Sequence, residues 1–144
     1  MKAVIQRVNE ANVKVDNKIV GQINKGLVVL LGISKDYSDE KFEWLAKKII
    51  NLRIWGSETK GFDLSINDIK GEILLVSQFT LHGSIKGNKP NFRNSLEYNL
   101  AQEVYERFIS KLKESGLKVE TGEFGAKMKV NLENDGPVTI ILEK

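Results

Sequence analysis

The sequence predicts an α+β fold in which a largely antiparallel, barrel-like β-sheet carries two flanking α-helices. Short apolar segments with strand character recur along the chain, and two longer segments have the periodicity of amphipathic helices. Their order is strands, helix, strands, helix, strands, which is typical of the α+β class. The 144 residues are expected to form one domain, 1–144, that is long enough to bury a sizeable core.

The first elements are predicted to be strands. Residues 1–10 have a short β pattern. Residues 11–23 have the pattern of a hairpin, because apolar and polar side chains alternate before a tight turn at Asp16-Asn17. Residues 27–33 are almost continuously apolar, as in a strand that is buried on both faces.

A helix is expected at residues 38–51. Ser38 is a good N-cap, and Asp39 and Glu40 follow it in the first turn, where the helix dipole favours negative charge. The spacing i, i+3, i+4, i+7 and i+8 predicts one buried face, made of Phe42, Leu45, Ala46, Ile49 and Ile50. A short strand at 52–55 and a polar segment at 56–71, read as a hairpin or a loop, should follow.

The second half of the chain is expected to contain the other helix, at 97–115, with Gly116 as its C-terminal cap. Before it, a buried strand should occupy 73–81 and a loop 82–95. After it, strands are expected at 117–121, 127–133 and 138–142, with a turn at 134–137 between the last two.

Composition excludes several kinds of chemistry. There is no cysteine and only one histidine, His82, so a thiol nucleophile is excluded and a zinc site is not expected. The phosphate-loop and dinucleotide-binding glycine patterns are absent, and we expect no metal or cofactor. No apolar run reaches the roughly 20 residues of a membrane span. With strand character from the first residues, this predicts a cytoplasmic protein without a signal peptide.

A basic segment is the clearest feature of the charge distribution. The net charge is only +3, yet residues 73–96 contain no acidic residue and include Lys86, Lys89 and Arg93. This segment is either a solvated loop or a loop that contacts phosphates.

Two polar segments are candidates for a site. In the first, Ser77-Gln78-Phe79-Thr80-Leu81 places hydroxyl and amide groups at the end of an apolar strand, where they either bond to neighbouring backbone or line an oxyanion site. A Ser77–His82 catalytic pair is a further alternative. The second, residues 134–139, contains Gly136-Pro137, which is either an ordinary turn or a cis junction with two carbonyl acceptors.

Together the two segments resemble the signature of the D-aminoacyl-tRNA deacylase family, also called D-tyrosyl-tRNA deacylases. The resemblance extends along the whole chain. It includes Met1–Val8, Lys25-Gly26-Leu27, Leu31-Gly32-Ile33, Asn51-Leu52-Arg53-Ile54-Trp55, residues 86–92 and residues 122–128.

The resemblance implies a homodimer in which the Gly-Pro segment of one subunit enters the active site of the other. The carbonyls of Gly136 and Pro137 would bind the α-amino group of the substrate, so that an L side chain collides with the pocket. Arg7 would hold these carbonyls, unless it is a surface strand arginine. The implied substrates are D-aminoacyl-tRNA and glycyl-tRNA, cleaved by an ester hydrolase that proofreads translation.

In this interpretation Ser77, Gln78, Phe79 and Thr80 line the ester, and backbone N–H groups near Phe79 and Thr80 stabilise the oxyanion. Either the 2′-hydroxyl of the terminal ribose assists the reaction, or Thr80 attacks as a nucleophile. We favour the first mechanism because the sequence offers Thr80 no obvious base. It also implies a preference for RNA, so no DNA partner is expected.

The resemblance also assigns substrate contacts outside the ester. Met128 and Phe124 would pack near the terminal adenosine, with sheet core as the alternative. Lys86, Lys89 and Arg93 would contact tRNA phosphates. The main rival is a non-catalytic nucleic-acid-binding barrel, but such modules display stacking aromatics, and aromatic residues are only 8% here. An esterase that uses Ser77 and His82 is the second rival.

Overall fold

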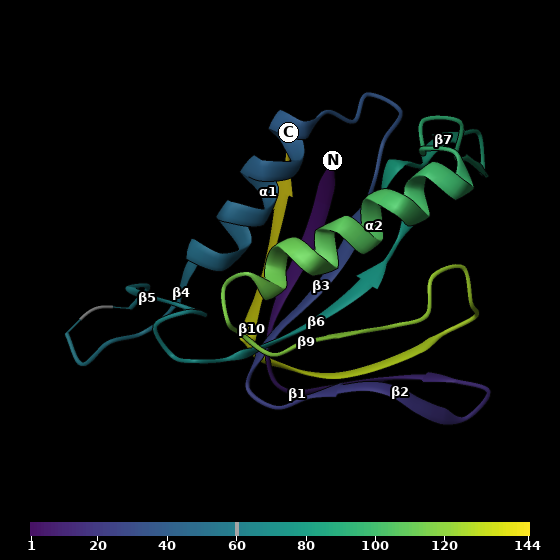
Figure 1. Cartoon of the computed structure of the whole chain (residues 1–144). Helices are drawn as coiled ribbons and strands as arrows, with labels where there is room; N and C mark the ends of the chain where they lie inside the picture. Colours follow the sequence, from purple (N-terminus) through teal and green to yellow (C-terminus); the bar gives the residue numbers. More distant parts are fainter. Residues whose placement is uncertain (60) are drawn as a thin grey trace.

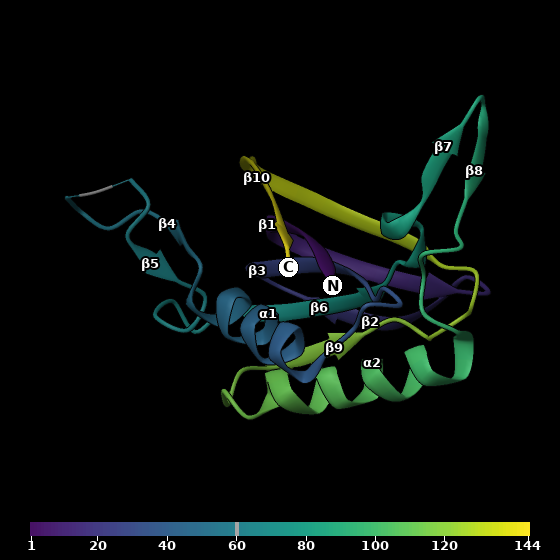
Figure 2. The same cartoon turned by 90° about the horizontal axis from the view of Figure 1, so that it is seen from above.

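The structure is a computed structural model that describes residues 1–59 and 61–144. It has the predicted α+β architecture, with a curled sheet, two helices over one face and two small hairpins that project from the body (Figures 1 and 2). The elements in chain order are β1 (Lys2–Val15), β2 (Lys18–Ile23), β3 (Gly26–Gly32), α1 (Asp39–Asn51), β4 (Arg53–Trp55), β5 (Leu64–Ser65), β6 (Glu72–Ser77), the 3₁₀ turn η1 (Phe79–His82), β7 (Ser84–Lys86), β8 (Lys89–Asn91), α2 (Tyr98–Lys113), β9 (Val119–Thr121) and β10 (Lys129–Glu143).

The main sheet runs in the order β10-β1-β3-β6-β9, and β2 pairs with the second half of β1. Strand β1 is antiparallel to β10, β2 and β3, whereas β3–β6 and β6–β9 are parallel pairs. Antiparallel pairings therefore predominate in a mixed sheet. Strand β2 approaches β9 so closely that a Cβ on Gly21 would lie 2.5 Å from the Thr121 carbonyl oxygen. This approach curls the sheet into a nearly closed barrel.

Strands β3 and β6 are buried on both faces, as their continuous apolar sequences predict. Alternate side chains of the two strands, such as Val29 and Leu75, pack under the helices with Phe108. The intervening side chains, such as Val28 and Leu74, fill the inside of the curled sheet. The two clusters place β6 at the centre of the molecule, with its C-terminal end leading out to η1.

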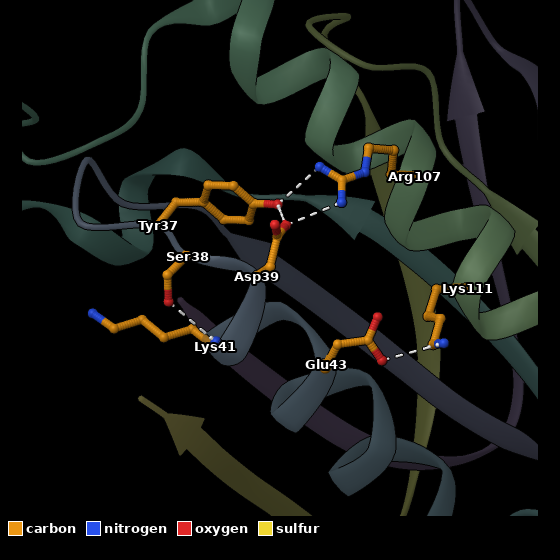
Figure 3. Close-up of polar contacts among 7 residues, drawn as sticks. All are labelled: Tyr37, Ser38, Asp39, Lys41, Glu43, Arg107 and Lys111. Atoms are coloured by element: carbon orange, nitrogen blue, oxygen red, sulfur yellow. Dashed lines mark hydrogen bonds and ion pairs between the residues drawn. The ribbon is translucent and has the colours of Figure 1, made fainter.

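The helices begin where the sequence predicts. Ser38 caps α1 by accepting a hydrogen bond from Lys41 N at 3.3 Å. Charged contacts join the two helices (Figure 3): Arg107 donates to the Tyr37 hydroxyl at 3.0 Å and to Asp39 at 3.1 Å, and Lys111 pairs with Glu43 at 3.2 Å. The buried face of α2, which includes Val104, Phe108 and Leu112, holds the helix over the sheet, and these exposed contacts add little to that packing. In the described part of the chain, neither helix is long and apolar enough to cross a membrane.

The strand expected at 73–81 ends earlier, at Ser77. Gln78 N makes a last hydrogen bond to the Leu31 carbonyl at 2.7 Å, and the backbone then turns, so that Leu81 N donates back to Gln78 O at 3.2 Å. The expected loop at 82–95 also contains structure, because β7 and β8 form a hairpin there. In the segment expected at 56–71, β5 pairs with β4. Residue 60 of that segment lies outside the described residues.

The turn expected at 134–137 is instead a bulge inside one long strand, β10. Gln6 pairs with Thr139 and Val8 with Asn134, so Arg7 alone lies opposite residues 135–138. The bulge allows β10 to stay paired with β1 on both sides of it. A sequence with a Gly-Pro dipeptide between two apolar segments does not distinguish this bulge from a hairpin turn, because long-range pairing decides between them.

Candidate active site

Four predicted site residues lie together where β6 ends. Ser77 is the last residue of the strand, Gln78 precedes η1, and Phe79 and Thr80 form the first half of that turn. Ser77 and Gln78 are half-buried, whereas Phe79 is 58% exposed. Ser77, Gln78 and Phe79 line a pocket of about 520 Å³. Thr80 lies beside them, at the exposed start of the turn.

Two backbone N–H groups are free at this end of the strand. The first hydrogen bond of η1 is donated by Leu81 N, so the N–H groups of Phe79 and Thr80 precede it. In the part of the chain that the structure describes, neither N–H has a hydrogen-bond acceptor. Free N–H groups on successive residues are the donors with which enzymes stabilise an oxyanion.

The side chains around the turn are held by local contacts. Gln78 Nε2 donates to Thr80 Oγ1 at 2.5 Å, and the Ser95 hydroxyl donates to the Phe79 carbonyl at 3.0 Å. The Phe79 ring packs edge-on against Phe92, with ring centroids 5.1 Å apart. Because an amide N–H donates to Thr80 Oγ1, this contact cannot remove a proton from the hydroxyl.

The opposite wall of the pocket comes from the chain after β9 and from the start of α2. Phe124 and Met128, the residues that the family resemblance places near the terminal adenosine, line it together with Tyr98. Phe124 contacts the rings of Tyr98 and Tyr105, at centroid distances of 5.2 and 5.4 Å. The wall is apolar and aromatic, so it suits a flat ring better than a charged group. Among the described residues that line the pocket, none has a carboxyl, imidazole or amino group.

The Gly136–Pro137 segment lies on the β10 bulge, exposed and outside the set of residues that line this pocket. Its peptide bond is cis. Arg7 holds the base of the bulge: Nε lies 2.9 Å from a carboxylate oxygen of Asp135 and donates to the Asp135 carbonyl at 3.3 Å, while Nη1 donates to the Ile54 carbonyl at 2.5 Å. The Arg7 side chain is only 14% exposed, so it is a buried link and not a surface strand arginine.

The predicted phosphate contacts lie on the hairpin side of the site. Lys86 and Lys89 form the last pair of the β7–β8 hairpin, and Arg93 follows it. All three side chains are exposed. The hairpin projects from the body (Figure 2), so its cations are accessible to a large anion.

His82 does not join Ser77 in one pocket. It ends η1 and lines a separate hollow of about 340 Å³ with Ser34, Asp36 and Asn94. Burial lowers the pKa of His82, and a hydrogen bond to the Gly32 carbonyl opposes this. The geometry therefore gives no support to a Ser77–His82 pair.

Sequence reasoning missed two residues of the site. Ser95 lies in the segment expected to be a loop and Tyr105 in the helix expected at 97–115, and the sequence predicts a role in the site for neither. The signal for Tyr105 was its hydroxyl, which a buried helix face must satisfy. The hydroxyl donates to the Leu75 carbonyl at 2.8 Å, beneath the pocket.

A small ester hydrolase is consistent with this pocket, which has two free backbone N–H groups beside it and no carboxyl, imidazole or amino group among its described lining residues. The family model described as D-Tyr-tRNA(Tyr) deacylase matches residues 4–143. The chain therefore belongs to this family of ester hydrolases.

Relatives of similar length support the assignment. The chain is 56% identical to the D-aminoacyl-tRNA deacylase of Clostridium botulinum (strain Alaska E43 / Type E3), over 99% of this chain and 97% of the relative. It is also 56% identical to that of Aquifex aeolicus (strain VF5), with the same coverage. The structure of a protein described as the c-Myc DNA unwinding element binding protein superposes with a TM-score of 0.94 at 42% identity, over 100% of this chain and 99% of the other.

A more distant solved structure, described as a probable eukaryotic D-amino acid tRNA deacylase, is 18% identical and has a TM-score of 0.85. The alignment covers 98% of this chain and 97% of that one. At this identity the likeness concerns the fold alone.

Proposed function

We propose that the protein hydrolyses the ester bond of D-aminoacyl-tRNA, and of glycine mischarged on other tRNAs, to the free amino acid and tRNA. It acts as a homodimer that proofreads chirality in translation. The observation that carries the proposal is the pair of free N–H groups on Phe79 and Thr80 beside a pocket whose described lining residues include no carboxyl, imidazole or amino group, in a member of a deacylase family. An ester carbonyl at this position develops negative charge that both donors stabilise.

Selection against L-amino acids uses main-chain oxygens of the partner subunit. The carbonyls of Gly136 and Pro137 bind the α-amino group and so fix the direction of the side chain, which in an L-amino acid collides with the pocket. Glycine has no side chain to reject. Two features support this arrangement: the segment is exposed on a bulge, and it does not line the pocket of its own chain. Arg7 keeps the bulge in place through Asp135 and Ile54.

The tRNA end is bound on either side of the ester. The terminal adenosine packs against Met128 and Phe124 on the apolar wall of the pocket. Lys86, Lys89 and Arg93 contact phosphates, for which their exposure is suited. The 2′-hydroxyl of the terminal ribose positions or activates the attacking water. The lack of a base among the pocket residues supports this substrate-assisted route.

The proposal is tested by the hydrolysis rates of four substrates: D-tyrosyl-tRNA, L-tyrosyl-tRNA, mischarged glycyl-tRNA and a D-tyrosyl-tRNA that ends in 2′-deoxyadenosine. We expect the first and third to be cleaved, and the L form to be cleaved at least about a hundredfold more slowly. The deoxy substrate should bind but remain intact. Equal rates for the D and L forms would contradict the selection mechanism, and rapid cleavage of the deoxy substrate would contradict the role of the 2′-hydroxyl.

A further inference from the structure

The pocket opens because β9 separates from β6 beneath it. The two strands pair from Ile73–Val119 to Leu75–Thr121, and Gly122 N makes the last hydrogen bond of the ladder, to the Leu75 carbonyl at 3.1 Å. Strand β6 then continues to Ser77, while the chain after β9 turns away and forms the other wall of the pocket. The end of β6 that leads into η1 therefore has a strand partner on one side only.

The unpaired side of β6 carries the Ser77 N–H. Ile73 N donates toward β9, to the Lys118 carbonyl at 2.9 Å, whereas Gln78 N donates toward β3. Backbone groups of successive residues in a strand point to alternate sides, so Ser77 N–H points the same way as Ile73 N–H, toward the space that β9 has left. An N–H without an acceptor in this half-buried position would destabilise the strand end.

Tyr105 of α2 fills this position. Its side chain is buried, at 2% exposed, and its hydroxyl donates to the Leu75 carbonyl at 2.8 Å. Burial raises the pKa of the hydroxyl, so it stays protonated, and a hydrogen bond with the Ser77 backbone opposes this rise in pKa. A tyrosine hydroxyl donates and accepts at once. One side chain can thus accept from the Ser77 N–H, which β9 no longer bonds, while it donates to the Leu75 carbonyl beside the Gly122 N–H.

We infer that Tyr105 is a positioning residue for the ester-cleaving site. Its hydroxyl bridges Leu75 O and Ser77 N–H, and so fixes the end of β6 from which Gln78 and the N–H groups of Phe79 and Thr80 are directed. The helix that carries it is held by its buried face, with Phe108 and Leu112, and Arg107 contacts Tyr37 and Asp39 at its surface (Figure 3). The inference rests on the proposed function, because it requires that this turn binds the oxyanion.

The test is Tyr105→Phe, which keeps the ring and removes the hydroxyl. The Leu75 carbonyl retains the Gly122 N–H, so we expect the variant to fold. For D-tyrosyl-tRNA, kcat should fall roughly tenfold while KM changes less than about twofold, since small displacements of a catalytic group reduce the rate more than binding. Ile49→Val, in the buried face of α1 and remote from the pocket, is the control for a similar loss of stability. If it reduces kcat equally, or if Tyr105→Phe leaves kcat unchanged, the inference is wrong.

Amide hydrogen exchange, followed by NMR, gives a second readout that does not depend on activity. In the unaltered protein, Ser77 N–H should exchange as slowly as Leu75 N–H although it lacks a strand partner. In Tyr105→Phe it should exchange at least tenfold faster, with shifted Phe79 and Thr80 amide signals. Fast exchange of Ser77 in the unaltered protein would overturn the bridge. If the protein does not cleave D-tyrosyl-tRNA at all, the proposed function fails, while the exchange data still decide whether Tyr105 holds the strand end.

Discussion

Thr80 has a hydroxyl at the site, and the described residues that line the neighbouring pocket offer it no carboxyl, imidazole or amino group as a base. Its hydrogen-bond partner in the structure is the amide N–H₂ of Gln78, which donates to Oγ1 and accepts no proton. A threonine nucleophile needs a base within hydrogen-bond reach. The contribution that the structure supports for Thr80 is its backbone N–H, which does not depend on the side chain.

Removing the hydroxyl should therefore leave most of the activity. We expect Thr80→Ala to deacylate D-tyrosyl-tRNA with a kcat within about tenfold of the unaltered protein, because the backbone donor remains in place. Single-turnover kinetics with saturating protein measures this directly. A folded Thr80→Ala protein that binds tRNA but does not cleave it would show that the hydroxyl is the nucleophile.

At the scale of elements, the β7–β8 hairpin is a basic arm beside the pocket. Lys86 and Lys89 face each other across its end, exposed, and the hairpin stands clear of the sheet (Figure 2). Because the two lysines are directly opposite each other in the strand pair, their like charges repel each other mildly unless an anion lies between them. This arrangement favours a phosphate as the partner of the hairpin.

Replacing Lys89 by alanine should weaken binding of tRNA whatever amino acid it carries. The salt dependence should also become shallower, by about one unit in the slope of log K against log salt, because one fewer counterion is released. Binding measured at several salt concentrations gives the slope. Lys47→Ala, an exposed lysine on α1, is the matched control and should change neither quantity. An unchanged slope in Lys89→Ala would exclude a phosphate contact.

Elements with local signals were predicted well from the sequence. The Ser38 cap and the apolar spacing after it located α1, and the continuous apolar sequence of β3 indicated burial on both faces. Elements that depend on distant partners were not. The early end of β6 follows from Leu31 as its last partner, and the β10 bulge follows from pairing with β1, more than 120 residues away.

The candidate site also has parts that could be predicted from the sequence and parts that could not. Ser77, Gln78, Phe79 and Met128 meet in one pocket, as predicted from segments whose residue types suggested a site. Backbone donors near Phe79 and Thr80 were expected only through the family resemblance, because the residue types alone do not indicate a 3₁₀ turn that begins just after the strand. The proposed positioning role of Tyr105 could not be predicted either, because it depends on where β9 separates from β6.

At the scale of the whole molecule, the selector and the pocket of one chain are separate features. Gly136 lies opposite Arg7 in the β1–β10 ladder, and it is absent from the residues that line the pocket. The proposed selection mechanism therefore requires two copies of the chain, arranged so that each bulge meets the pocket of the other. Such a reciprocal arrangement is what a two-fold symmetric dimer provides.

Subunit mixing distinguishes this arrangement from a site within one chain. Gly136→Ala should disable the selector, since its Cβ would lie 2.9 Å from Arg7 Nη2 at a backbone φ of 119°, and Gln78→Ala should disable the pocket. Each homodimer should be nearly inactive on D-tyrosyl-tRNA. After unfolding and refolding an equal mixture, about one quarter of full activity should return, because half of the dimers contain one intact composite site. If no activity returns although mixed dimers form, selector and pocket work within a single chain.

The two free N–H groups at Phe79 and Thr80 belong to the peptide bond, and every amino acid except proline supplies this donor. Most point substitutions at these two positions would therefore leave the N–H donors in place, provided that the chain still forms the turn after β6. A search for catalytic residues that considers only reactive side chains would miss a site of this kind. Among related proteins, such a site is better recognised by its backbone conformation.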